Sequence, residues 1–268
     1  MVFNRLRDAL GWRWHRAARL RYLRTTFTNG EELARSYLDR TPCDTAVCRD
    51  GTVIRHPAGR AGLAGMILEV WFDEVYTGAF YTPRPGDVVI DAGANIGLFS
   101  LAVARRCRDC RVLAYEPFDQ NYQALRQNLA AGRAAGVRAY HLAVSGAAGV
   151  AAMTDGGGRS QDHRLTAAAG PAAAGVRTVS LADVFATAGA GEVALFKCDI
   201  EGSEADVFRH ASAEQLRRAK RYAIEYHDNL RPGTLALLQE RLRPTHDVVL
   251  RPAAEGGYGM LYATARPA

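Results

Sequence analysis

The residues best suited to catalysis are acids and a histidine that follow two apolar runs in the last third of the chain. Asp199 and Glu201 follow one of these runs, and Glu225 and His227 end the other. The carboxyl ends of parallel strands border the crevice where open sheets bind ligands, so we expect the four side chains to converge there. A histidine ordinarily has a pKa near neutrality. The pattern therefore predicts His227 as a general base, with Asp199 and Glu201 as competing candidates and Glu225 orienting His227.

A second group forms a turn with the pattern Asp91-x-Gly93-x-Asn95-x-Gly97. The two glycines let the backbone turn tightly and let a ligand approach closely, and the following helix points unsatisfied N–H groups toward that ligand. A dinucleotide fold has the pattern G-x-G-x-x-G, so Asn95 in place of its second glycine argues against NAD. An acid and an amide suit a ligand with an ammonium group and no phosphate, as at the amino-acid end of S-adenosylmethionine. Asp199 is expected to border the same ligand.

A further acid, Glu116, ends the next apolar run, 25 residues after Asp91. In doubly wound folds an acid at the end of the second strand bonds the ribose hydroxyls of a nucleotide. We therefore expect Glu116 to bind a ribose, Pro117 to stop the strand and Phe118 to stack on the adenine. Val144, at the end of the third strand, should border the adenine.

Strand-like and helix-like segments alternate from residue 87 onward, which is the pattern of a doubly wound α/β domain. Strands are expected at 88–90, 111–116, 137–144, 176–181, 193–198, 222–227, 246–250 and 259–264. The last two could form an antiparallel edge pair. The helix that follows residue 203 begins with Glu204, for which a favourable interaction with the helix macrodipole is a sufficient explanation. The Gly- and Ala-rich stretch 155–175 is expected to be a long loop, either a lid or an insertion.

The first third of the chain is expected to form a helical and hairpin cap, residues 1–82, before the α/β domain at 83–268. Residues 1–28 have apolar positions at helical spacing among many arginines, which predicts one or two basic amphipathic helices. Such a segment usually packs on its own domain, but it also suits an anionic surface or a phosphate backbone. A hairpin is expected around Asp50-Gly51, and a helix over 60–81.

Composition narrows the class of protein. The chain has 268 residues, 48% hydrophobic and 23% charged, so it can form a full α/β domain and is not disordered throughout. The formal charge of +6 comes almost wholly from arginine, which we attribute to compositional bias rather than to nucleic-acid binding. No apolar run has the length of a membrane span, and no secretory signal is evident, so we expect a cytoplasmic protein.

The five cysteines argue against a disulfide framework, because their number is odd and no secretory signal precedes them. Cys43-x4-Cys48 and Cys107-x-x-Cys110 have spacings seen in structural zinc sites. Short motifs of this kind often occur by chance, so reduced thiols are the favoured interpretation and no metal is expected.

Taken together, the motifs resemble those of the FkbM family of S-adenosylmethionine-dependent methyltransferases. The resemblance covers roughly residues 70 to 230 and rests on four motifs in order, Asp91-x-Gly93-x-Asn95-x-Gly97, Glu116-Pro117, Lys197-x-Asp199-x-Glu201-Gly202-x-Glu204 and Glu225-x-His227. It implies a Rossmann-like class I methyltransferase fold, with a seven-stranded, mostly parallel sheet between helices. It also implies O-methylation of a small-molecule hydroxyl, on a sugar or a secondary-metabolite intermediate such as an antibiotic precursor.

Two alternatives remain open at this stage. One is a methyltransferase for RNA or another nucleic acid that grips its substrate with the basic N-terminus. The other is a non-catalytic binding protein on a methyltransferase fold. The methyl acceptor and the oligomeric state, including a homo-oligomer, are left open by the sequence.

Overall fold

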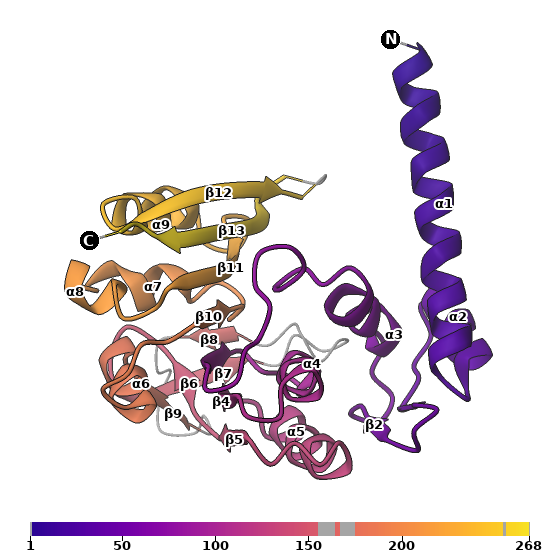
Figure 1. Ribbon diagram of the computed structural model, residues 1–268, viewed down its shortest axis with the longest axis horizontal. Helices are drawn as coiled ribbons and strands as arrows, with labels where there is room; N and C mark the ends of the chain where they lie inside the picture. The colour runs from indigo at the N-terminus through magenta and orange to yellow at the C-terminus, as the bar shows by residue number, and fades with distance from the viewer. Residues whose placement is uncertain (1, 155–163, 167–174, 254–255, 268) are drawn as a thin grey trace.

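A seven-stranded sheet runs through the centre of the protein (Figure 1). The computed structural model describes residues 2–154, 164–166, 175–253 and 256–267. The strand order is β12-β13-β11-β10-β3-β4-β5; the last five are parallel, and β13 and β12 continue the sheet antiparallel. The strands are β3 Val88–Ala92, β4 Arg111–Tyr115, β5 Val137–Tyr140, β10 Leu195–Cys198, β11 Arg221–His227, β12 His246–Pro252 and β13 Tyr258–Ala265. The expected mostly parallel sheet with an antiparallel edge pair is thus confirmed.

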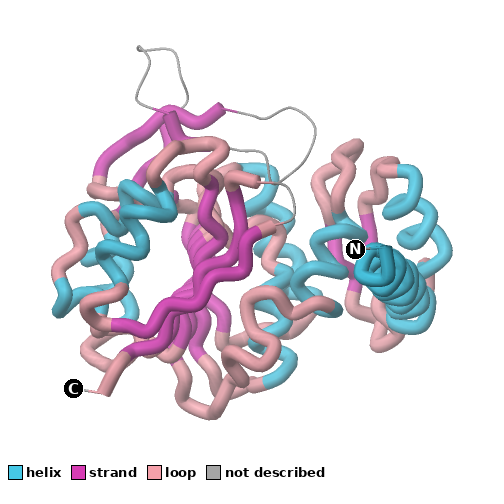
Figure 2. Tube along the Cα trace, turned by 90° about the horizontal axis from the view of Figure 1, so that it is seen from above, coloured by secondary structure: helices cyan, strands magenta, loops and turns pink. Residues whose placement is uncertain are grey.

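Apolar side chains leave both faces of this sheet, because successive residues of a strand point to opposite sides. One face carries Val89, Leu195 and Ala223, and the other carries Ile90, Phe196 and Ile224. Helices lie on either side of the central strands (Figure 2). These helices are α4 Leu98–Arg106, α5 Asp119–Ala131, α6 Leu181–Ala188, α7 Glu204–Arg209, α8 Ala213–Leu216 and α9 Thr234–Leu242. Burial on both faces explains why the parallel strands are continuous apolar runs in the sequence.

The N-terminal segment packs against α4 and α5. Its elements are α1 Val2–Thr26, α2 Gly30–Asp39, the antiparallel strands β1 Thr45–Val47 and β2 Val53–Arg55, α3 Leu63–Ile67 and the π-helix η1 Leu68–Phe72. Apolar residues such as Phe27, Ile54 and Ile67 share one buried cluster with Leu101 and Leu125. The first part of α1 projects away from the rest of the protein (Figure 1). The predicted hairpin is confirmed, and the basic N-terminus is a single helix.

Three sequence-based expectations for secondary structure were wrong in part. The helix expected over 60–81 ends at Phe72, since Glu74 adopts a left-handed conformation with φ of 51°. The strand expected over 137–144 divides into β5 and β6 Ala143–Val144. The segment after residue 175 forms β9 Gly175–Val179, which belongs to a separate sheet with β6, β7 Gly149–Thr154 and β8 Arg164–Thr166. Most of the 155–175 loop lies outside the described residues; the described residues 164–166 form β8, a strand that the loop prediction did not include.

None of the helices in the described part of the chain combines the length and apolarity that crossing a bilayer would require. All five cysteines are buried and carry free thiols.

Candidate active site

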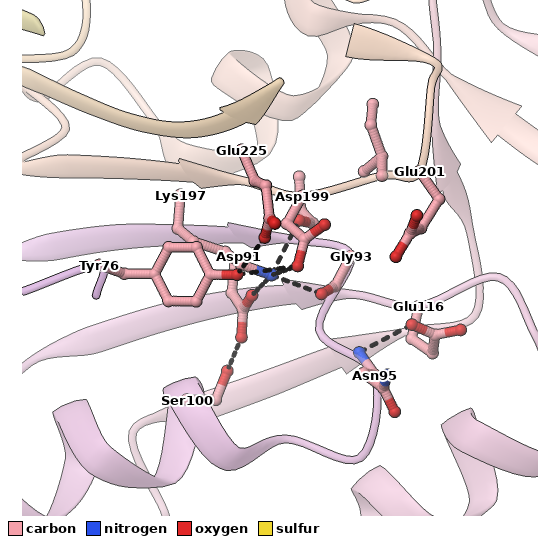
Figure 3. Close-up of polar contacts among 12 residues, drawn as sticks. Tyr76, Asp91, Gly93, Asn95, Ser100, Glu116, Lys197, Asp199, Glu201 and Glu225 are labelled. Carbon is pink, nitrogen blue, oxygen red and sulfur yellow. Dashed lines mark hydrogen bonds and ion pairs between the residues drawn. The ribbon is translucent and has the colours of Figure 1, made fainter. Parts of the chain in front are cut away.

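Two loops meet where the strand order reverses, between β3 and β10 (Figure 3). Asp91 of β3 pairs with Lys197 of β10 in the sheet register, so the residues that follow the two strands emerge side by side. Gly93 lies against the backbone of Asp199: a Cβ built on Gly93 would stand 1.7 Å from the Asp199 carbonyl oxygen. Its φ of 75° also favours glycine. The predicted turn and the predicted acid group therefore line one crevice.

Asp91 and Lys197 form a buried ion pair beneath this crevice. Asp91 Oδ1 lies 3.2 Å from Lys197 Nζ without the alignment of a hydrogen bond, and Oδ2 accepts a 2.6 Å hydrogen bond from Ser100. Lys197 Nζ also donates to the Gly93 carbonyl at 2.5 Å. Burial opposes the lysine charge, but the carboxylates of Asp91 and Asp199 outweigh it and raise the pKa of Lys197. Asp91 is fully buried, so it holds the turn from below instead of contacting a cofactor as the sequence suggested.

Glu116 directly follows β4 and closes the turn from the side. Its Oε2 accepts the backbone N–H of Asn95 at 2.8 Å, and its Oε1 accepts that of Phe118 at 2.9 Å, across Pro117. Burial raises the pKa of Glu116 to about 7, although both N–H groups favour the charged form. Each carboxylate oxygen can accept one more hydrogen bond. The expected ribose contact stays a prediction that this geometry permits.

The other residues expected at the cofactor have different surroundings. One face of the Phe118 ring is covered by the Arg60 guanidinium, 5.4 Å from the ring centroid. A Cβ on Gly97 would stand 2.6 Å from Leu125 Cδ1, and the φ of 89° also favours glycine, so a larger residue would strain the turn and displace Leu125. Val144 is 2% exposed and belongs to the core of the sheet. Its side chain therefore offers a ligand almost no surface.

Tyr76 joins two of the predicted catalytic acids (Figure 3). Its hydroxyl donates to Asp199 Oδ2 at 2.9 Å and lies 3.1 Å from Glu225 Oε2. Burial, together with the charges of Asp199 and Glu69, raises the pKa of Glu225 to about 9. A hydroxyl has one proton, so one of these two contacts needs a proton from a carboxyl group, and the raised pKa of Glu225 makes it the carboxyl that can supply one. Burial and the charge of Asp199 likewise raise the pKa of Glu69 to about 7.

His227 is held by Glu204, not by Glu225 as expected. Its Nδ1 lies 3.0 Å from Oε1 of the fully buried Glu204, and its Nε2 lies 3.5 Å from Glu201 Oε2. Glu204 also accepts the backbone N–H of Gly202 at 3.1 Å, so the macrodipole alone does not explain this acid. Burial opposes protonation, but the hydrogen bond and charge of Glu204 outweigh it and raise the pKa of His227 to about 9. A protonated imidazole has no free lone pair, so this geometry does not favour His227 as a general base.

A cavity of about 230 Å³ opens beside the turn and the acids. It is lined by the turn from Gly93 to Ile96, by residues of α3, η1 and α4, by Tyr76 and Tyr258, by Lys197 of β10 and Glu225 of β11, and by Asp199 and Glu201 after β10. The acidic residues that line it are Glu69, Asp199, Glu201 and Glu225. The sequence analysis did not identify Glu69 or Tyr258, and it placed Tyr76 only within the helix expected over 60–81. No motif marks these residues, because they come from distant segments that only the tertiary packing brings to the sheet edge.

The comparisons with known proteins point to one family of methyltransferases. The family model described as the methyltransferase FkbM domain matches residues 91–244. The 31-O-demethyl-FK506 methyltransferase FkbM of Streptomyces tacrolimicus is 30% identical over 210 residues, which cover 67% of this chain and 80% of that protein. Methyltransferase sdnD of Sordaria araneosa is 27% identical over 209 residues, 65% of this chain and 79% of that protein.

Among solved structures, an rRNA methylase from Streptococcus thermophilus has a TM-score of 0.44 at 11% identity, covering 69% of this chain and 89% of that chain. At this level the likeness says nothing of the substrate. The family model spans more than half of the sequence. The chain therefore belongs to the FkbM family of methyltransferases.

Proposed function

We propose that the protein is an S-adenosylmethionine-dependent O-methyltransferase for a hydroxyl group of a small molecule, such as a sugar or a secondary-metabolite intermediate. The observation that carries the proposal is the cavity at the reversal of strand order, where the glycine turn and four acidic residues face the same space. The relative named 31-O-demethyl-FK506 methyltransferase gives this reaction type independent support.

The residues present fit the chemistry of S-adenosylmethionine. The turn from Gly93 to Asn95 lines the cavity with backbone, and the nearby carboxylates suit an ammonium group. Glu116 keeps one acceptor position on each oxygen, which suits the two hydroxyls of a ribose. Phe118 lies two residues after Glu116, so its ring is the aromatic group proposed to stack on the adenine. Contacts within the chain hold the turn: the Asn95 N–H bonds Glu116, and Gly97 packs against Leu125.

The chain's part in the reaction would be orientation and proton removal. When bound, S-adenosylmethionine supplies a methyl group on a positively charged sulfur. The hydroxyl oxygen of the acceptor forms the new O–C bond as the C–S bond breaks, and the bonding electron pair stays on sulfur. The hydroxyl proton must leave, and a carboxylate within hydrogen-bond reach can accept it. Glu69, Asp199 and Glu201 face the cavity, whereas His227 lies behind Glu201 and is paired with Glu204.

The nucleic-acid alternative has less support from the described arginines. Several of those near the N-terminal segment are paired with acids: Arg19 with Asp73, Arg24 with Glu31, and Arg105 with Asp50. Pairing lowers the positive potential that a phosphate backbone would meet.

A product search tests the proposed function. The protein is incubated with S-adenosylmethionine carrying an isotope-labelled methyl group and with a fractionated extract of hydroxylated metabolites, and the products are examined by mass spectrometry. We expect a labelled compound one CH₂ heavier than its precursor, formed by wild type and by Glu240→Gln, an exposed acid on α9, and missing with Asp199→Asn. Label transferred only to RNA, or equal product from wild type and Asp199→Asn, would contradict the proposal.

A further inference from the structure

Asp199, Glu201 and His227 form a group of side chains with ligand atoms close to one another, which we call the donor cluster. One ligand atom from each residue lies within 4.8 Å of the other two. The donors come from the ends of β10 and β11, which are parallel neighbours in the sheet. Asp199 and Glu201 also line the cavity. The donor cluster is therefore anchored by two strands and lies in the wall of the proposed active site.

The histidine of the cluster is oriented as metal-binding histidines are. His227 is 6% exposed, and its Nδ1 is engaged by the buried carboxylate of Glu204 at 3.0 Å. This leaves Nε2 directed toward Glu201, at 3.5 Å. Histidines that bind metals usually direct their second ring nitrogen to a carboxylate or a carbonyl, which fixes the ring and makes it a better ligand. His227 has both features: the buried carboxylate of Glu204 at Nδ1, and a candidate fellow ligand, Glu201, near Nε2.

The oxygen of Asp199 that is not used by Tyr76 supplies a second, separate observation. Oδ2 accepts the Tyr76 hydrogen bond, but Oδ1 is buried and has no hydrogen-bond partner among the described residues. A buried carboxylate oxygen without a partner is costly in a folded protein. The nearest lysine does not satisfy it, because Lys197 Nζ lies 3.2 Å from Asp91 and 4.0 Å from Asp199 Oδ2. A cation bonded to Asp199 Oδ1 would satisfy this oxygen.

We propose that Asp199, Glu201 and His227 bind one divalent cation of the Mn²⁺ type, with Glu204 as the positioning residue for His227. Two carboxylates and one imidazole form a mixed set of oxygen and nitrogen ligands. This set suits Mn²⁺ better than Ca²⁺, which is bound by oxygen ligands alone. Bonds of about 2.1 Å place neighbouring ligands roughly 3 Å apart, so small side-chain rotations would close the cluster. His227 would bind through neutral Nε2, and the proton displaced from Nε2 would pass to solvent.

Three protein ligands leave positions open for water or substrate, as in catalytic metal sites. On the proposed function, an open position beside the cavity would hold the acceptor oxygen and favour loss of its proton. Glu69, which lines the cavity but lies outside the donor cluster, would then be the carboxylate available to accept that proton. This extension rests on the proposed function, whereas cation binding does not. The inference departs from the sequence analysis, which expected no metal.

Electron paramagnetic resonance of Mn²⁺ tests the site without any methyl acceptor. Tag-free, chelator-treated protein is titrated with Mn²⁺, and the signal of free Mn²⁺ reports how much is bound. We expect one Mn²⁺ per chain in wild type and in the control Glu240→Gln, and at least tenfold weaker binding in Glu201→Gln and Asp199→Asn. Spin-echo modulation from a directly bonded imidazole nitrogen should appear in wild type, a readout that does not depend on any variant folding.

No Mn²⁺ binding by the folded wild type, or bound Mn²⁺ without a coordinated nitrogen, would overturn the site. Unchanged affinity in the folded variants would overturn it as well. S-adenosylmethionine binding is measured separately by calorimetry in the presence of chelator. Binding of S-adenosylmethionine without Mn²⁺ binding would refute only the metal site, and Mn²⁺ binding without S-adenosylmethionine binding would refute only the proposed function.

Discussion

At the scale of single residues, burial decides what each acid at the sheet edge does. Asp91 lies near the end of β3, and Asp199 directly follows the neighbouring parallel strand β10. Asp91 is nevertheless fully buried and paired with Lys197, whereas Asp199 faces the cavity. Glu204 is buried as deeply as Asp91, and its partner is His227. Asp199 and Glu201 keep partly exposed side chains at the cavity, whereas Asp91 and Glu204 support other residues from within the core.

Glu116→Ala should weaken the binding of S-adenosylmethionine by about 1–3 kcal/mol, because the ribose would lose its carboxylate acceptor. The affinity is measured by calorimetry on protein whose melting temperature shows that it is folded. Glu240→Ala, which removes an exposed acid on α9, is the control and should bind as wild type does. An unchanged dissociation constant in folded Glu116→Ala would remove this residue from the cofactor site.

Tyr76→Phe should lower the free energy of unfolding by about 1–3 kcal/mol, because the carboxyl groups of Asp199 and Glu225 lose their shared hydroxyl. Denaturant titration gives this quantity. Tyr258→Phe is the matched control, since Tyr258 also lines the cavity, and a much smaller loss is expected there. Equal losses in the two variants would show that the Tyr76 bridge contributes no stability of its own.

At the scale of elements, the turn after β3 depends on how closely it approaches the loop after β10. Gly93→Ala would place a methyl group 1.7 Å from the Asp199 carbonyl oxygen at a φ of 75°. Gly86, in the loop before β3, has a similar φ of 85°, but a methyl group there would meet no other atom within 4 Å. The two glycines thus separate the effect of backbone conformation from the effect of steric contact.

Gly93→Ala should destabilise the protein by more than about 4 kcal/mol or prevent folding, whereas Gly86→Ala should cost about 1–2 kcal/mol, the penalty of the left-handed conformation alone. Urea denaturation of both variants measures the difference. If the two substitutions cost the same, the β3 and β10 loops do not pack as closely as described.

His56, which follows β2, should make the stability of the N-terminal hairpin dependent on pH. Burial lowers the pKa of His56 from 6.5 to about 4. The unfolded chain therefore binds the proton first as the pH falls. The contribution of neutral His56 to the free energy of unfolding is thus complete above about pH 6.5 and is lost progressively down to pH 4. Relative to His56→Gln, wild type should lose up to about 3 kcal/mol between pH 7 and pH 4 in denaturant titrations. Parallel stability curves would show that His56 is not buried in its neutral form.

The sequence was informative for elements with strong local patterns. Apolar runs such as Val88–Ala92 and the alternation of strands and helices predicted the parallel sheet, and Asp50-Gly51 predicted the hairpin. It was less informative where long-range packing decides. Nothing local assigns β9 to a second sheet, and nothing local ends the helix at Phe72.

At the scale of the whole molecule, the candidate site is assembled from both parts of the chain. Tyr76 and Glu69 precede the α/β domain, and both reach acids at the ends of β10 and β11. The sequence therefore predicted the correct edge of the sheet for the acids but not their roles, because these roles depend on partners from other segments. For the same reason it assigned His227 as a base without the knowledge that Glu204 holds it.

The measurement that tests the central claim most directly is a calorimetric titration of the whole chain with S-adenosylmethionine. The account predicts saturable binding with one site per chain, because contacts within the chain hold Glu116 and the turn from Asp91 to Gly97 in place. S-adenosylhomocysteine should compete for the same site, and NAD should not, since Asn95 occupies the place where a dinucleotide fold has a glycine. The absence of any binding heat from folded protein at high S-adenosylmethionine concentration, confirmed by equilibrium dialysis, would contradict the assignment of this cavity to methyl transfer.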